Sequence, residues 1–132
     1  MRKKILITGA ILGLLAVILG AFGAHALKKI LTADQLTSFE TGVRYQMYHA
    51  LLLLFVGMSN LISPKMLRLT YVFVLWGIIL FSGSIYLLAT KDATGIDITS
   101  IGFITPIGGT LLIAGWIALG LNFFKLKTEK IS

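Results

Sequence analysis

The side chains with the most varied chemistry lie in one short segment, residues 39–54, which reads FETGVRYQMYHALLLL. A carboxylate, a guanidinium, two phenols, an amide and an imidazole precede an unbroken run of leucines there, and a second imidazole lies upstream. A few convergent polar groups beside apolar surface are typical of a ligand site. The candidate ligand-binding residues are His25, Glu40, Arg44, Tyr45, Gln46 and His49.

These residues offer little for catalysis or metal binding. The chain has two histidines, five carboxylates and no cysteine, which excludes disulfides, thiolate metal sites and cysteine nucleophiles. His25 and His49 have the chemistry to ligate haem axially, but no haem-attachment motif is present. No serine, carboxylate and histidine group has a catalytic spacing, and no glycine-rich phosphate loop follows a strand. We predict that the protein is not an enzyme and has no cofactor and no metal site.

Composition indicates what surrounds these residues. The chain is 57% hydrophobic and only 13% charged, whereas a soluble domain is about half apolar and about a quarter charged. So few charges are not enough to cover a surface that is exposed to water. Lipid therefore surrounds part of the chain. In that setting His49 is the one group of the apolar segments that titrates near neutral pH, which leaves proton movement or transport as a further hypothesis.

Four apolar runs cover about residues 5–24, 45–62, 69–90 and 101–124. Each is long enough to cross about 30 Å of hydrocarbon as a helix. The runs lack the alternation of barrel strands. The predicted fold class is therefore all-α, an integral membrane four-helix bundle in which residues 1–132 form a single membrane domain.

The charges predict the topology of this bundle. Four crossings place both termini and the second connection on one side, with basic residues Arg2, Lys3, Lys4, Lys65, Arg68, Lys125, Lys127 and Lys130. The other side holds Lys28, Lys29, Arg44 and Lys91, balanced by Asp34, Glu40, Asp92 and Asp97. The positive-inside rule then puts both termini in the cytoplasm. The net charge of +7 then lies on the cytoplasmic side, where it suits anionic lipid headgroups. No folded basic surface remains to bind nucleic acid.

Small residues predict close helix packing. The first run begins after three basic residues and ends near Ala24-His25-Ala26, which also resembles a signal peptide. We favour a retained helix, because its small residues recur on one face where a neighbouring helix can approach. The predicted helix-packing residues of the whole chain are Gly9, Gly13, Gly20, Gly23, Gly83, Pro106, Gly108 and Gly109.

The second helix begins outside its apolar run. Thr32 and Gln35 have capping-box spacing, which predicts a helix start near residue 33 and an interfacial segment over about 33–44. Glu40 and Arg44 are spaced to pair, although an exposed pair contributes only about 0.3–0.5 kcal/mol. His49 is expected to face the bundle interior or a water-filled cavity. Whether it meets His25, on the same side of the membrane, is left open.

Two hypotheses remain for the start of the last helix. Thr105 and Pro106 suit an N-cap followed by the first helical position. Alternatively, one helix runs from about Thr99 and is kinked at Pro106. Four polar residues are expected to hydrogen-bond between helices: Ser82, Ser84, Thr105 and His49.

Four ordered motifs carry a resemblance to a known family. They are residues 21–27 (AFGAHAL), 39–50 (FETGVRYQMYHA), 81–84 (FSGS) and 105–109 (TPIGG). Together they resemble the small bacterial membrane-protein family known as domain of unknown function 423. The resemblance covers essentially the whole chain. It implies a four-helix, multi-pass protein of the bacterial inner membrane, with relatives in mitochondria and no established activity.

Two functions follow as hypotheses. The first is a structural or accessory component of the membrane, whose polar residues pack the helices and anchor the outer interface. The second is a binder of a lipid, quinone or similar amphiphile at the outer polar residues. In either case the expected partners are membrane lipids and further copies of the chain, and not nucleic acid.

Overall fold

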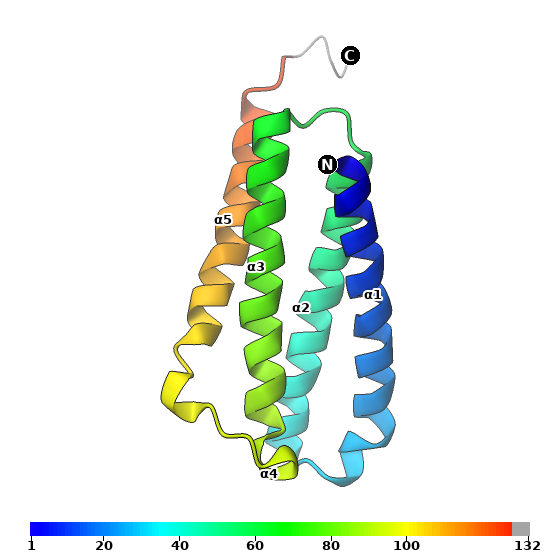
Figure 1. The fold of residues 1–132 in the computed structure, drawn as a ribbon, viewed down its shortest axis with the longest axis vertical. Helices are drawn as coiled ribbons and strands as arrows, with labels where there is room; N and C mark the ends of the chain where they lie inside the picture. Colours follow the sequence, from blue (N-terminus) through cyan, green and yellow to red (C-terminus); the bar gives the residue numbers. More distant parts are fainter. Residues whose placement is uncertain (128–132) are drawn as a thin grey trace.

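Helices are the regular secondary structure of residues 1–127, the part of the chain that this computed structural model describes. Figure 1 shows the long helices side by side. They are α1 (Arg2–His25), α2 (Ala33–Met58), α3 (Pro64–Ala89) and α5 (Ile104–Phe124). The connections contain the short helices η1 (Leu27–Lys29), α4 (Lys91–Thr94) and η2 (Thr99–Ile101). The all-α prediction is confirmed for these residues.

Each long helix packs against the next one in the sequence. The main contacts join α1 to α2, α2 to α3, and α3 to α5. The N-terminus, the α2–α3 connection and the end of α5 lie together at the upper end of Figure 1, and η1 and α4 lie at the opposite end. The helices therefore run alternately up and down, as short connections between neighbours favour.

Three segments are long and apolar enough to cross a membrane. They are Arg2–Lys29, Pro64–Ala89 and Ile104–Phe124. Helix α2 is not among them, because polar residues such as Arg44, Gln46 and His49 interrupt it before its short apolar end. Only its last nine residues, 50–58, are uniformly apolar. Hydropathy alone thus supports three crossings among residues 1–127.

Two helices have ends that differ from those of the predicted apolar runs. The predicted run at 45–62 extends past the end of α2 at Met58. The run predicted at 69–90 begins after the true start of α3, where Ser63 is the N-cap and Pro64 is the first helical residue. The Ser63 hydroxyl accepts a hydrogen bond from the backbone N of Met66 at 3.4 Å. Capping, which satisfies the free backbone groups, sets these ends, whereas hydropathy reports only where apolar residues are frequent.

The predicted start of α2 is confirmed. The backbone N of Thr32 donates to Gln35 Oε1 at 3.0 Å, and the backbone N of Gln35 donates to Thr32 Oγ1 at 3.2 Å. This reciprocal pair forms a complete capping box. The Gln35 amide also donates to Asp92 Oδ2 at 2.9 Å, which ties the start of α2 to α4.

Helix α5 begins differently from both hypotheses. It starts at Ile104, so Pro106 is its third residue, and η2 is separated from it by Gly102 and Phe103. The first four backbone N–H groups of a helix have no partner within it, so proline at this position breaks no hydrogen bond. Thr105 is not the N-cap; its hydroxyl instead bonds to Ser84. Pro106 itself is exposed, which leaves it a role in starting the helix rather than the predicted packing role.

The interior has two apolar clusters. The larger joins all four long helices through residues such as Ile5, Val74 and Leu112. The smaller lies near η1 and includes Leu27 and Phe39. Polar residues of α2 and α3 fall between the two clusters along the helices. The polar side chains are therefore held between two apolar layers, where an unpaired group would be costly.

The outward faces of α1 and α5 are strongly apolar. Leu14, Val17, Ile113 and Ile117 are each 56–61% exposed. Extended apolar surface of this kind is rare on soluble monomers and marks contact with lipid or with another protein. These faces therefore suit a bilayer.

Several predicted packing glycines lie at close helix contacts. A Cβ on Gly9 would lie 3.0 Å from the Ala50 backbone O, and one on Gly23 would lie 3.1 Å from the Phe39 ring. A Cβ on Gly108 would collide with the backbone of α3 at Phe81. Ordinary contact distances are found for three others: Gly13, Gly20 and Gly109.

Gly83 differs from the other predicted packing glycines. A Cβ there would meet no atom of the described residues within 4 Å. It makes no close contact among these residues, so its packing role stays a prediction. The α3–α5 contact relies instead on Gly77 and Gly115, where a Cβ would lie 2.6 Å from Leu112 Cδ2 and 2.7 Å from Val74 Cγ2, respectively.

Candidate functional site

The six candidate ligand-binding residues divide into two groups. Gln46 and His49 are each only 4% exposed and point into the helix bundle. The other four are exposed: His25, Glu40, Arg44 and Tyr45. The division follows from α2 being packed between α1 and α3, so that one face of the helix is enclosed and the other is open.

His49 links α2 to α5. Its Nδ1 lies 2.7 Å from the Tyr45 backbone O, one turn earlier. The indole Nε1 of Trp116 donates to His49 Nε2 at 3.1 Å. Since a carbonyl only accepts and an indole N–H only donates, the imidazole is neutral with its proton on Nδ1. Both ring nitrogens are used, so the imidazole has no free nitrogen for a metal or a haem iron.

Gln46 joins three helices. Its Nε2 donates to the Leu12 backbone O of α1 at 2.8 Å. The hydroxyl of Tyr86, on α3, donates to Gln46 Oε1 at 2.6 Å. Both ends of the amide are therefore bound within the protein, and Gln46 fixes the positions of α1 and α3 relative to α2.

Serine and threonine side chains extend these links. Ser82 Oγ donates to the Gly42 backbone O at 2.7 Å, between α3 and α2. The hydroxyls of Ser84 and Thr105 lie 2.5 Å apart, between α3 and α5. The interhelical bonds predicted for Ser82, Ser84, Thr105 and His49 are thus present. We call the whole set the polar network: Gln46, His49, Ser82, Ser84, Tyr86, Thr105 and Trp116.

The exposed charged residues do not form the expected ion pair. Arg44 Nη2 donates to Thr41 Oγ1 at 3.1 Å, and the structure contains no ion pair between Glu40 and Arg44. An exposed pair gains so little that a local hydroxyl competes with it. Glu40 and Arg44 instead border a shallow hollow of about 240 Å³ above Gly20 and Gly23.

The two histidines are far apart. On α1, Gly9 and Gly13 face Ala50, whereas Gly23 faces Phe39. His25 is therefore level with the start of α2, about ten residues and about 15 Å along the helix from His49. It lies beside Lys28 and Lys29. The open question of whether the imidazoles meet is answered: they do not.

Tyr45 and Asp97 are both exposed, Tyr45 on α2 and Asp97 between α4 and η2. The Tyr45 ring lies 5.0 Å from that of Phe81 and 5.7 Å from that of Tyr48, centroid to centroid. Asp97 Oδ1 accepts hydrogen bonds from the hydroxyl and the backbone N of Thr99. These bonds hold the pKa of the Asp97 carboxyl below its ordinary value. The Tyr45 ring also stacks on the His49 imidazole, with centroids 6.3 Å apart, whereas the hydrogen bonds of Asp97 are to Thr99.

Sequence reasoning missed three residues that matter to these contacts. Trp116 and Tyr86 supply the donors to His49 and Gln46, and Asn122 bonds to the α2–α3 connection. Each is a hydrogen-bonding side chain inside an otherwise apolar run, and such groups in lipid need a partner. That signal was available in the sequence. Within residues 1–127, no group of three or more His, Cys, Asp or Glu side chains is placed to hold a metal ion.

Comparison with known proteins supports the family resemblance. The family described as Protein of unknown function (DUF423) matches residues 19–109. A UPF0382 membrane protein of Haemophilus influenzae is 45% identical over 97% of this chain and 99% of its own length. The UPF0382 membrane protein SSP2132 of Staphylococcus saprophyticus is 41% identical, over 94% and 99%. The UPF0382 inner membrane protein YgdD of Escherichia coli is 38% identical, over 98% and 96%.

No solved structure matches this fold. The relatives nevertheless align along nearly their whole lengths and carry the words membrane protein in their names. Their names agree with the three membrane-capable helices found here. The chain therefore belongs to the DUF423 family and is a membrane protein.

Proposed function

We propose that this chain is a multi-pass protein of the inner membrane in which all four long helices cross the bilayer and both termini are cytoplasmic. Helix α2 runs antiparallel between α1 and α3, so its apolar end lies beside apolar residues of those two helices, at the same depth in the bilayer. Its interior polar groups are satisfied by Leu12, Tyr86 and Trp116, which lowers the cost of burial in lipid. The basic residues at the end that holds the N-terminus and the end of α5 support a cytoplasmic assignment.

The absence of native cysteine makes this topology directly testable. Single cysteines at Lys28 and Ile96 are expected to react with a membrane-impermeant maleimide on intact spheroplasts. Cysteines at Lys4 and Asn60 are expected to react only after the membrane is permeabilised. Lys28 and Asn60 flank α2, so labelling of both from the same side would show that α2 does not cross.

We further propose a structural or accessory role rather than an enzymatic one. The observation that carries this role is that the buried polar side chains of the core, apart from Thr70, are hydrogen-bonded within the protein, largely between helices. Both nitrogens of His49 and both ends of the Gln46 amide have protein partners. Groups bonded in this way position the helices, and binding a substrate would require these bonds to be shared or broken.

A stability measurement tests the structural role. His49→Gln keeps a hydrogen-bonding side chain but cannot satisfy Tyr45 and Trp116 in the same geometry. We expect the purified variant to unfold at lower SDS fraction, with unchanged topology and abundance at low temperature. A variant of unchanged stability whose cells nevertheless show the phenotype of a deletion would argue for a ligand or a proton at His49 instead.

The amphiphile-binding alternative stays a prediction with one favourable feature. Arg44 and Glu40 border the hollow above Gly20 and Gly23. Its volume of about 240 Å³ is below the 300–1,000 Å³ usual for small-molecule sites, so it accommodates a headgroup rather than a quinone. Mass spectrometry of the purified protein tests this function, with loss of a co-purified lipid in Arg44→Ala as the expected result.

The outward apolar faces suggest the partners of such a protein. Exposed side chains on α1 and α5 fit lipid tails and the helices of other membrane proteins, including further copies of this chain. Nucleic acid is not among the proposed partners, because the basic residues are gathered at the membrane surface. Cross-linking in native membranes, followed by size analysis, tests self-association.

A further inference from the structure

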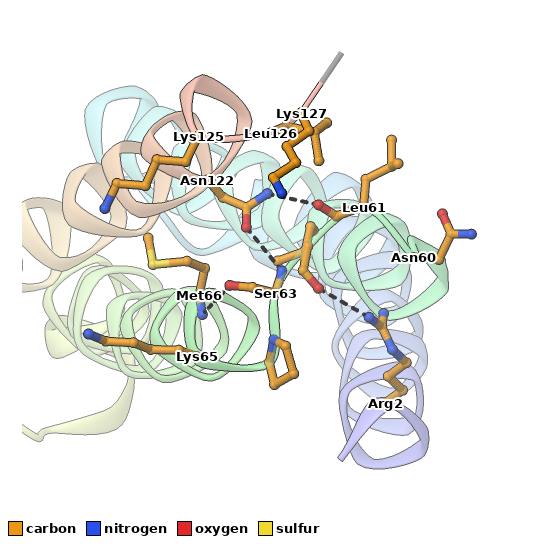
Figure 2. A pocket seen from close by; sticks show the side chains of 12 residues that line it. Arg2, Asn60, Leu61, Ser63, Lys65, Met66, Asn122, Lys125, Leu126 and Lys127 are labelled. Carbon is orange, nitrogen blue, oxygen red and sulfur yellow. Dashed lines mark hydrogen bonds between the residues drawn. The ribbon is translucent and has the colours of Figure 1, made fainter. Parts of the chain in front are cut away.

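A cavity of about 670 Å³ lies at the end of the molecule that holds the N-terminus and the end of α5. Figure 2 shows that it is formed by the start of α1, the α2–α3 connection, the start of α3 and the residues that follow α5. Four basic side chains line it: Arg2, Lys65, Lys125 and Lys127. No carboxylate is among its lining residues in the described part of the chain. The cavity therefore concentrates positive charge.

Arg2 holds one wall of the cavity in place. Its Nη1 donates to the backbone O of Val56 at 3.2 Å, of Gly57 at 3.4 Å and also of Ser59. Its Nη2 donates to the Ile62 O at 3.4 Å. The last carbonyls of a helix lack partners within it, so one guanidinium satisfies the end of α2 and orders the connection.

Asn122 of α5 holds the opposite wall. Its Oδ1 accepts from the backbone N of Ser63 and its Nδ2 donates to the Leu61 O, both at 3.0 Å. The side chain is only 6% exposed, and both bonds are visible in Figure 2. The α2–α3 connection is therefore fixed from both sides, and a ligand in the cavity meets a preformed backbone.

The lysines supply the charge for binding. Arg2 is committed to the α2 carbonyls, whereas Lys65, Lys125 and Lys127 are exposed around the cavity. The described acids all lie toward the other end of the molecule: Asp34, Glu40, Asp92 and Asp97. No described carboxylate is therefore close enough to neutralise the lysines, and the local field favours an anion.

We propose that this cavity binds the phosphate group of an anionic phospholipid. The cavity lies at the ends of three membrane-capable helices, where headgroups are found. Leu126 forms part of its lining, and the neighbouring Phe124 is 90% exposed. Apolar surface beside a cationic cavity fits an amphiphile better than free phosphate. The inference rests on the part of the proposed function that has α1, α3 and α5 cross the membrane.

Native mass spectrometry of the full chain in detergent tests this inference, with phosphatidylglycerol, phosphatidylcholine and inorganic phosphate as probes. The test variant is Lys65→Gln with Lys125→Gln and Lys127→Gln. The control is Lys3→Gln with Lys4→Gln and Arg68→Gln, which removes the same charge at the same end without touching the lining. Arg2 stays intact in both, and thermal melts verify that both fold.

The wild-type chain and the control are expected to bind phosphatidylglycerol more tightly than phosphatidylcholine. The test variant is expected to lose at least about tenfold, since each lysine near a headgroup contributes about fivefold. An equal loss of affinity in the control would overturn the inference, because it would mean that the overall positive charge of this end, and not the cavity, attracts the lipid. If inorganic phosphate bound as tightly as phosphatidylglycerol and displaced it, the assignment of a lipid as the ligand would be overturned. Binding is measured in detergent, so a failed topology assay does not change these outcomes.

Discussion

Adding one methyl group to adjacent glycines of α5 is expected to have opposite effects. Gly108 and Gly109 belong to the same helix and to the same motif. A Cβ on Gly108 would lie 2.7 Å from both the Leu80 carbonyl C and the Phe81 Cα, which are backbone atoms of α3. A Cβ on Gly109 would lie 3.5 Å from the Phe81 ring, an ordinary contact.

The magnitude follows from these distances. Non-bonded carbons are best separated by about 3.5–4.0 Å, so Gly108→Ala forces α3 and α5 apart by about 1 Å. Backbone does not rotate away as a side chain does, so the cost is at the upper end of the range of about 1–3 kcal/mol for overpacking. The gain in helix propensity from alanine offsets about 0.5–1 kcal/mol. Gly108→Ala is therefore expected to lower the free energy of unfolding by about 2 kcal/mol.

Gly109→Ala has the propensity gain without the collision and is expected to raise stability by about 0.5–1 kcal/mol. The assay is unfolding of the purified variants by SDS in mixed micelles, followed by far-UV circular dichroism. Equal stabilities for the two variants, or a more stable Gly108→Ala, would refute the close α3–α5 contact from which the estimate is made.

Three smaller predictions use the same assay. Trp116→Phe removes the donor to His49 Nε2 and is expected to cost about 1 kcal/mol; no loss would mean that this bond is absent in the membrane. Thr70→Val is expected to gain about 1 kcal/mol, because the Thr70 hydroxyl is buried without a hydrogen-bond partner among the described residues, and a loss would reveal a hidden partner. Glu40→Gln is expected to stay within about 0.5 kcal/mol of wild type, because Glu40 makes no ion pair with Arg44, and a larger change would show that such a pair forms in solution.

The sequence alone was enough to identify a helical membrane protein and its family. Four apolar runs and a scarcity of charge follow directly from composition, and a helix of the required length is the simplest way to satisfy the backbone in lipid. The start of α2 was equally predictable, because the capping box at Thr32 and Gln35 involves residues within one turn of each other. Local interactions of this kind are visible in the order of residues.

Helix boundaries were predicted less well where hydropathy was the only guide. The ends near Met58 and Pro64 depend on which backbone groups are capped, and the caps come partly from distant residues. Arg2 binds the carbonyls at the end of α2, more than fifty residues away. Averaging over an apolar window cannot locate such a contact.

The candidate site depended most on tertiary structure. The sequence indicated six polar residues by their types and motifs, but the packing of α2 between α1 and α3 decided that Gln46 and His49 turn inward while Glu40, Arg44 and Tyr45 do not. Their partners, Tyr86 and Trp116, lie 40 and 67 positions away in the chain.

The basic cavity also depends partly on the sequence and partly on the tertiary structure. The sequence determined the number and sign of the charges near both termini. Only the tertiary structure brought Arg2, Lys65 and Lys125 around one space, because three chain segments meet there. Residue order determines what each segment prefers, whereas contacts between segments exist only once the helices have packed.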